Sequence, residues 1–82
     1  MQSETKTPRT FERHDLATVV PELVGRVHDA QFASLREIAT AYAVDKATAL
    51  RWKARAIVIG LIDERSWRLA MLRARMQREM AA

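Results

Sequence analysis

Hydrophobic residues recur at intervals of three and four in the first half of the chain, with charged residues between them. The first stripe with this spacing consists of Val20, Leu23, Val24 and Val27. Such a stripe gives a helix one apolar face, and Thr18 before it is a suitable N-cap. Pro21 would then lie in the first turn, where its missing N–H removes no helical hydrogen bond. The pattern predicts a helix from about Val19 to Ala30.

Two further helices are marked by their start signals. Ser34-Leu35-Arg36-Glu37 is a capping box, in which the serine and glutamate side chains accept hydrogen bonds from each other's backbone N–H groups. A short helix from about Leu35 to Ala41 should follow. Asp45 is a second N-cap and Gly60 is typical of the residue after a helix end, so the next helix should span about 46–59. Its expected inward positions are Ala49, Trp52, Ala56 and either Ile57 or Ile59.

The segment from Ser66 to Met80 contains no glycine, proline or β-branched residue. Leu69, Leu72 and Met76 repeat there at three and four, which predicts a fourth helix. The stripe is widened by Trp67, Met71 and Met80. Residues 1–10 lack apolar periodicity and should form a flexible arm, whereas residues 11–16 fit a short helix, a strand or a tether across the domain.

These elements predict an all-α fold of four helices in one small domain. We expect an N-terminal arm over residues 1–17, a helical domain over 18–62 and a C-terminal helical segment over 63–82. A chain of 82 residues has a thin core, and it has no cysteine with which to form disulfides. Oligomerisation is the remaining way to bury more surface, which favours a dimer.

Composition excludes several kinds of chemistry. Without cysteine there is no thiol nucleophile, and His14 and His28 are too few and too far apart to make a structural zinc site. We find no phosphate-binding glycine loop and no nucleophile–base set, so we expect neither an enzyme nor a cofactor. Although 49% of residues are hydrophobic, no apolar run approaches the ~18 residues of a membrane span. The polar start lacks a signal peptide, so we expect a soluble cytoplasmic protein.

Charge is distributed unevenly along the chain, whose net charge is +4. Residues 46–62 carry four basic side chains and no acidic one, and residues 65–78 carry five arginines and no acid. A basic second half is typical of proteins that bind nucleic acid, although a solvated arginine-rich surface fits the same composition. An anionic membrane surface is a lesser alternative for the arginines of the last helix, which are Arg68, Arg73, Arg75 and Arg78.

Residues 34–54, SLREIATAYAVDKATALRWKA, combine a short capped helix, a tight turn and a second capped helix with basic residues. This segment resembles the helix-turn-helix of bacterial transcriptional regulators, whose pattern "LREIA…A…GVSKSTVSRW" is matched by residues 35–39 and 44–52. Ala39 falls at the helix crossing of that family. Two departures are Ala43 at the turn glycine and Ala49 in place of valine or isoleucine. The segment Gly60-Leu61-Ile62-Asp63-Glu64 resembles the entry to the wing of winged regulators, but a helical pattern replaces the wing.

The resemblance implies a recognition helix, about residues 46–58, that lies in the DNA major groove. It assigns base contacts to Lys46, Ala47 and Arg51, with Asp45 and Leu50 as further candidates. Arginine and lysine pair with guanine, and alanine contacts the thymine methyl. The contacts it assigns to the DNA backbone are Arg36, Thr48, Lys53 and Arg55. Trp52 falls at a buried position of the motif, which favours core packing over base stacking.

A single helix-turn-helix reads few base pairs, so a second copy is expected. The residues that we assign to a two-fold helix contact are Trp67, Leu69, Leu72 and Met76. The same stripe could dock on its own chain, and Trp67 in particular fits packing on the body. No metal or small-molecule ligand is expected.

The resulting hypothesis is a homodimeric repressor that binds a palindromic operator in double-stranded DNA, associates with the nucleoid and resembles small plasmid or phage regulators. The alternative is a DNA-binding antitoxin, or an accessory or architectural protein with a partner-binding tail.

Overall fold

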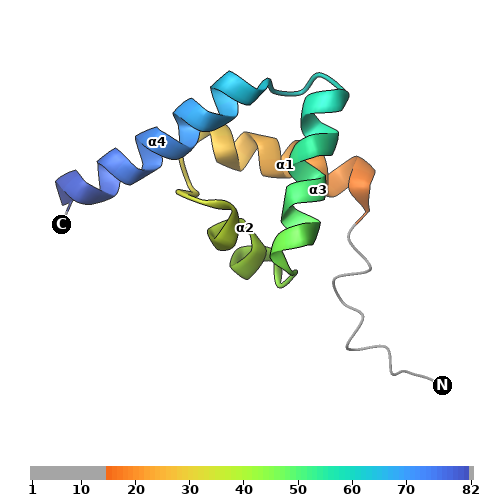
Figure 1. Cartoon of the computed structure of the whole chain (residues 1–82), viewed down its shortest axis with the longest axis horizontal. Coiled ribbons are helices and arrows are strands. Elements are labelled where there is room, and N and C mark those ends of the chain that lie inside the picture. The colour runs from red at the N-terminus through yellow and green to blue at the C-terminus, as the bar shows by residue number, and fades with distance from the viewer. Residues whose placement is uncertain (1–14, 82) are drawn as a thin grey trace.

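The computed structural model describes residues 15–81, and these residues form four α-helices and no strand (Figure 1). The helices are α1 Leu16–His28, α2 Leu35–Tyr42, α3 Lys46–Val58 and α4 Glu64–Ala81. The all-α fold with four helices that the pattern predicted is thereby confirmed for this part of the chain. The flexible arm expected at residues 1–10 lies outside the described residues. No helix in the described range is long and apolar enough to cross a bilayer.

The start of α1 differs from the prediction. Asp15, not Thr18, is the N-cap: its carboxylate accepts hydrogen bonds from the Ala17 N–H at 3.1 Å and the Thr18 hydroxyl at 3.4 Å. Three more residues therefore join the helix, and the boundary expected between residues 17 and 18 falls inside its first turn. Pro21 lies inside α1, where it has no N–H to offer the Ala17 carbonyl.

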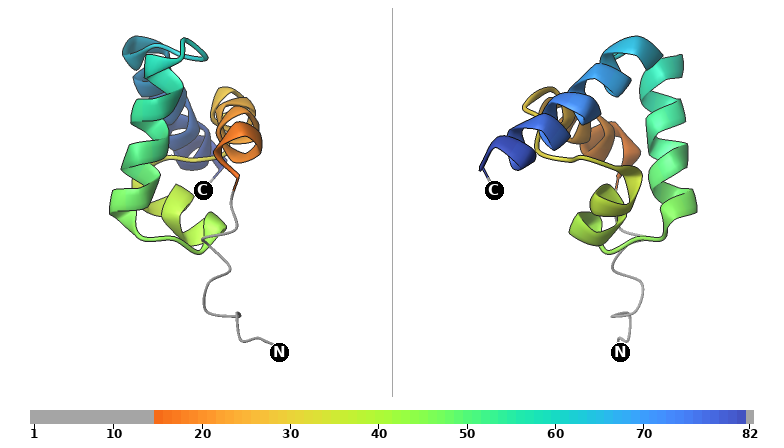
Figure 2. Two further views of the ribbon diagram at one scale, coloured as in Figure 1. Left: turned by 90° about the vertical axis from the view of Figure 1, so that its right-hand side faces the viewer. Right: turned by 60° about the vertical axis from the view of Figure 1, so that its left-hand side comes forward.

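The core lies where α1 packs against α3 and α4, while α2 packs against α3 (Figure 2). α1 supplies one face of closely spaced valines and leucine, and α3 supplies Ala49, Trp52 and Ala56. The α1 stripe is wholly buried and comprises Val19, Val20, Leu23, Val24 and Val27. The predicted inward positions of α3 are thus confirmed, except that Ile59 is 50% exposed and Ile57 is only half-buried.

α4 packs on the core through a different face from its stripe of leucine and methionine. Its buried side chains are Trp67, Ala70, Met71 and Ala74. Alanine at two of these positions lets the helix backbone approach α1 closely, with the tryptophan filling the space beside it. The stripe of Leu69, Leu72 and Met76 lies on the outer side, and each of these side chains is about half exposed.

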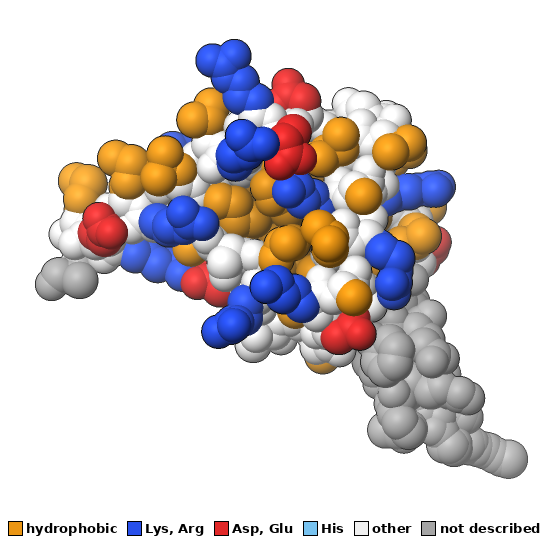
Figure 3. Space-filling view, in the orientation of Figure 1, with side chains coloured by type: hydrophobic (Ala, Val, Ile, Leu, Met, Phe, Trp, Pro, Cys, Tyr) orange, Lys and Arg blue, Asp and Glu red, His pale blue; other side chains and the backbone are white. Residues whose placement is uncertain are grey.

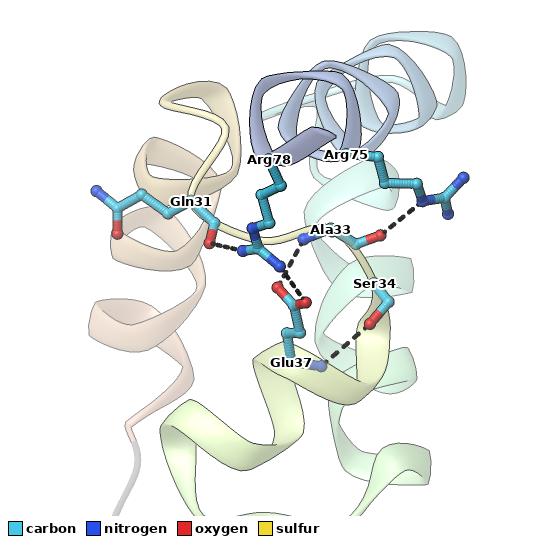
Figure 4. Close-up of polar contacts among 6 residues, drawn as sticks. All are labelled: Gln31, Ala33, Ser34, Glu37, Arg75 and Arg78. Atoms are coloured by element: carbon cyan, nitrogen blue, oxygen red, sulfur yellow. Dashed lines mark hydrogen bonds and ion pairs between the residues drawn. The ribbon is translucent and has the colours of Figure 1, made fainter. Parts of the chain in front are cut away.

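Arginines hold the C-terminal half of α4, which extends past the other helices in Figure 1. Arg73 donates to the His28 carbonyl at 2.6 Å, and Arg75 donates to the Ala33 carbonyl at 3.1 Å. Arg78 donates to the Gln31 carbonyl at 3.2 Å and forms an ion pair with Glu37 (Figure 4). Three of the four arginines considered for a membrane surface therefore contact residues between the end of α1 and the start of α2, whereas Arg68 does not.

Candidate nucleic-acid interface

The two short-range caps of α2 and α3 set the geometry of the candidate interface. The Ser34 hydroxyl accepts from the Glu37 N–H at 3.3 Å, as expected. The Glu37 carboxylate, however, accepts from the Ala33 N–H at 2.9 Å, and not from the Ser34 N–H that a reciprocal capping box requires (Figure 4). Asp45 caps α3 by accepting from the Thr48 N–H at 2.8 Å. Both helices therefore begin at the residues that the sequence marked.

A three-residue turn, residues 43–45, joins the two helices. Ala43 adopts the left-handed conformation at φ 57° and ψ 45°, which is the conformation that a glycine would favour. In this conformation the Ala43 and Val44 N–H groups donate to the Thr40 and Ala39 carbonyls and close the end of α2. Alanine thus occupies the turn position without altering the turn.

The outer face of α3 is opposite its buried face of Ala49, Trp52 and Ala56. The Trp52 ring meets the Tyr42 ring edge to face at 5.4 Å between centroids, which fixes α3 against the end of α2. Trp52 is 4% exposed, so it packs in the core as expected. The exposed residues on the outer face are Lys46, Ala47, Leu50, Arg51, Ala54, Arg55 and Val58.

All three side chains predicted to contact bases are exposed, and they lie in the first two turns of α3. Arg51 is anchored by a hydrogen bond of 3.1 Å from its guanidinium to the Thr48 hydroxyl. Lys46 is the first residue of the helix, and Ala47 exposes a small methyl surface beside it. All three side chains are therefore accessible, and Lys46 also lines a groove between α3 and α4, whereas Ala47 and Arg51 do not.

The residues predicted to contact phosphates are less uniform. Arg36 on α2 and Arg55 on α3 are exposed, and Thr48 is half-buried. Lys53 faces α4 instead: its ammonium forms an ion pair with Glu64 at 3.1 Å and lies 5.8 Å from the centre of the Trp67 ring. Lys53 therefore lies away from the outer face, where the resemblance had assigned it with the other cations.

A groove of about 740 Å³ lies between the start of α2, the inner flank of α3 and the side of α4. Apolar side chains form its floor and cations surround it, and Figure 3 shows this hollow with basic groups around it. Its lining residues are Ser34, Leu35, Arg36, Lys46, Lys53, Trp67, Arg68, Leu69, Met71, Leu72 and Arg75. Sequence reasoning missed this groove, because it forms only when α4 folds back over residues 34–36.

The comparisons give no relative for this arrangement. No family model, curated protein or solved structure matches the chain significantly. The chemistry of the candidate interface is therefore argued from its own residues.

The carboxylates near the interface are held in their charged form. Hydrogen bonds from the Thr48 side chain and backbone lower the pKa of Asp45. The hydrogen bond from Lys53 lowers the pKa of Glu64, and the contact with Arg78 lowers the pKa of Glu37. Within residues 15–81, no three His, Cys, Asp or Glu side chains form a group that could hold a metal ion. The groups that this surface offers to a partner are thus cationic and apolar, because the three carboxylates accept hydrogen bonds in helix caps or form ion pairs.

Three of the four residues predicted for the dimer contact lie on the outside of α4. Leu69, Leu72 and Met76 are 54%, 47% and 52% exposed, and Met80 beyond them is 85% exposed. Trp67 is 2% exposed and belongs to the core of its own chain, so its assignment to a contact between chains was wrong. The physical reason is that Trp67 lies on the same side of α4 as Ala70, Met71 and Ala74.

Proposed function

We propose that this protein is a sequence-specific DNA-binding repressor that acts as a homodimer on a palindromic operator. The observation that carries the proposal is the outer face of α3, where Lys46, Ala47 and Arg51 are exposed on a helix whose opposite face is buried. A helix of this kind fits the major groove of B-DNA, which is wide enough to admit one.

The proposed base readers have distinct roles. Arg51 donates two N–H groups to the O6 and N7 atoms of a guanine, and Lys46 provides a second donor at the start of the helix. Ala47 contacts a thymine methyl, since its small side chain lets the helix approach the base edges closely. The hydrogen bond between Arg51 and the Thr48 hydroxyl restricts the arginine before DNA binds.

Phosphate contacts fix the helix in register without reading sequence. Arg36 at the start of α2 and Arg55 on α3 are exposed, and their guanidinium groups form no hydrogen bond within the described range, so their charge is available to the DNA backbone. The N-terminus of α2 adds the partial positive charge of a helix dipole. The Lys53 ammonium already has a carboxylate partner and contributes less than the other cations.

A dimer provides the second half-site that one short recognition helix requires. The exposed Leu69, Leu72 and Met76 of α4 supply the surface for that contact. Repression would then follow from occupation of a promoter, with the concentration of dimers as the controlling variable. The protein would act in the cytoplasm, on the nucleoid.

Selection from randomised duplex DNA with the purified protein, at two salt concentrations, tests this function. We expect an enriched palindrome with half-sites about one helical turn apart, which is ~34 Å. Arg51→Ala should lose discrimination at one or two positions by about 1–3 kcal/mol. Arg65→Ala removes the same charge from an exposed position on α4 and should leave the motif unchanged.

Two results would contradict the proposal. Binding that depends strongly on salt and enriches no motif would mean that the cations only hold phosphates. A motif that Arg51→Ala and Arg65→Ala alter equally would remove Arg51 from the base readers. The comparison of the two variants is separable from a folding defect. Both arginine side chains are exposed, so neither substitution should change the far-UV circular dichroism spectrum.

A second candidate function is supported by the apolar part of the same face. Leu50 and Val58 on α3 are 51% and 81% exposed, and they give the outer face an apolar area that a protein partner could cover. An interaction module, such as an antitoxin or an accessory protein, would use α3 to dock on another protein. Val58→Ser should then weaken partner binding, whereas for a DNA reader it should change affinity only slightly, because Val58 is assigned to no DNA contact.

A further inference from the structure

The exposed apolar stripe of α4 has opposite charges at its two ends. Its large side chains are Leu69, Leu72, Met76 and Met80. Arg65 and Arg68 are exposed at the N-terminal end of this stripe, and Glu79 is exposed at the C-terminal end. The stripe is therefore basic at one end, apolar in the middle and acidic at the other end.

This polarity favours one way of pairing two copies. Side by side in the same direction, the helices would place Arg65 against Arg65 and Glu79 against Glu79 of the second copy. Like charges that face each other across a helix pair are destabilising. When the two helices lie side by side in opposite directions, the basic end of each helix meets the acidic end of the other. The two helix dipoles are then antiparallel, which is also favourable.

We infer that two copies of the chain associate through an antiparallel α4–α4 contact, in which Leu72 packs beside Met76 of the second copy and Arg68 pairs with Glu79 of the second copy. This inference rests on the dimeric part of the proposed function and adds the direction, the register and two charge pairs. With Leu72 beside Met76, Leu69 comes beside Glu79 and Met80. Arg68 and Glu79 then lie on the same flank of the pair, within one residue of the same level.

The other charges near the stripe are compatible with this pairing. Arg73 and Arg75 lie close to the centre of the contact, but their guanidinium groups donate to the His28 and Ala33 carbonyls of their own chain. Arg68 is 76% exposed on its side chain, and its contact to Glu64 is a long one of 3.4 Å. Glu64 has a closer partner in Lys53 at 3.1 Å, so Arg68 can turn to the second copy without leaving that carboxylate alone.

Single cysteines distinguish the two directions, because the chain has no cysteine of its own. Leu72→Cys and Met76→Cys proteins are mixed in equal amounts, oxidised mildly and analysed by mass spectrometry. An antiparallel pair brings position 72 close to position 76, whereas two copies of position 72 are offset by four residues, about 6 Å along the axis. Disulfides need Cα atoms within about 7 Å, so the mixed disulfide should dominate over both symmetric ones. Dominant symmetric disulfides would overturn the inference.

A charge exchange provides the second test. Sedimentation velocity of the wild-type protein over a concentration series should show a reversible dimer. Arg68→Glu and Glu79→Arg should each raise the dimer dissociation constant by about tenfold, and the double variant should restore it. Leu72→Glu should leave a folded monomer. A wild-type monomer at all concentrations, or a double variant weaker than both single variants, would overturn the inference.

These outcomes are separable from those of DNA selection. Symmetric disulfides in a protein that still enriches a palindrome would overturn the antiparallel contact and leave the repressor proposal standing. A mixed disulfide in a protein that enriches no motif would support the antiparallel contact and contradict the repressor proposal.

Discussion

The pair α2 and α3 and the long helix α4 are both rich in cations, but they use them differently. The side chains of Arg36, Lys46 and Arg55 are exposed and form no hydrogen bond to the described part of the chain. On α4, Arg73, Arg75 and Arg78 bind carbonyl oxygens of residues 28–33. The first set is available to a partner, whereas the second set attaches α4 to the domain.

The two regions also differ in how far along the chain their contacts reach. The caps of α2 and α3 join residues three positions apart, as in Asp45 with Thr48. The arginines of α4 reach residues more than forty positions away, as in Arg73 with the His28 carbonyl. Charge density alone therefore does not identify a binding surface.

The largest expected effect separates the buried face of α4 from its outer face. Trp67→Ala should lower the free energy of unfolding by about 3–5 kcal/mol, because it leaves a large cavity between α4 and α3. Leu72→Ala should lower it by less than about 0.5 kcal/mol in the monomer, since Leu72 is 47% exposed. Urea unfolding followed by circular dichroism, at concentrations where the chain is monomeric, measures both. Equal losses in the two variants would mean that Leu72 also packs on its own chain.

The two turns that begin α3 and α4 offer a contrast in backbone strain. Ala43 has φ 57° and Gly60 has φ 83°. Ala43→Gly should raise stability by up to about 1 kcal/mol, because it relieves a left-handed alanine. Gly60→Ala should lower stability by about 1 kcal/mol through conformation alone, since its Cβ would meet no atom within 4 Å. Thermal unfolding of both variants checks the signs, and a loss of stability in Ala43→Gly would contradict the strain argument.

Local signals in the sequence predicted the α2 and α3 boundaries closely, because a capping side chain acts on a backbone group within three residues. The same kind of signal predicted the start of α1 wrongly. Thr18 and Pro21 together resembled a cap and a first turn, but the carboxylate of Asp15 is the stronger acceptor and starts the helix earlier. The loss of one hydrogen bond at Pro21 is offset by the burial of the valines that follow it.

The orientation of α4 could not be predicted locally. Two stripes with helical spacing run along it, one of leucine and methionine and one of tryptophan, alanine and methionine. The spacing of the first stripe fitted either a contact with a second copy or docking on the same chain, and spacing alone did not decide between them. A helix that crosses α1 closely needs small residues at the contact, and Ala70 and Ala74 supply them. The groove beside α4 depends on residues more than thirty positions apart, such as Arg36 and Arg68, so no local pattern indicates it.

A smaller, local effect tests whether the α4 arginines attach the helix. Arg78→Gln removes the donor to the Gln31 carbonyl and the ion pair with Glu37. We expect faster amide hydrogen exchange over the last two turns of α4 and unchanged exchange in α3. Arg65→Gln removes the same charge from another exposed position on α4 and serves as the matched control. Unchanged exchange in Arg78→Gln would mean that packing alone holds this end of α4.

The smallest effect concerns Glu37, a side chain of α2 that also contacts α4. It accepts from the Ala33 N–H near the start of α2 and forms the ion pair with Arg78 of α4. The hydrogen bond from Arg78, followed by that from Ala33, lowers the pKa of Glu37 below its ordinary value of 4.5. A carboxyl with a lowered pKa in the folded state stabilises the protein above its ordinary pKa, and this contribution is lost as the pH falls through the folded value.

The wild-type melting temperature should therefore fall more steeply between pH 5 and pH 3 than that of Glu37→Gln, in about the range where carboxyls titrate. Asp45 and Glu64 also have lowered pKa values and give both proteins a shared acid sensitivity, so the difference between the curves isolates Glu37. Glu37→Gln in the Arg78→Gln background should show a smaller difference, because the largest cause of the pKa shift is gone. Parallel curves for the wild type and Glu37→Gln would mean that the ion pair between α2 and α4 adds no stability in solution.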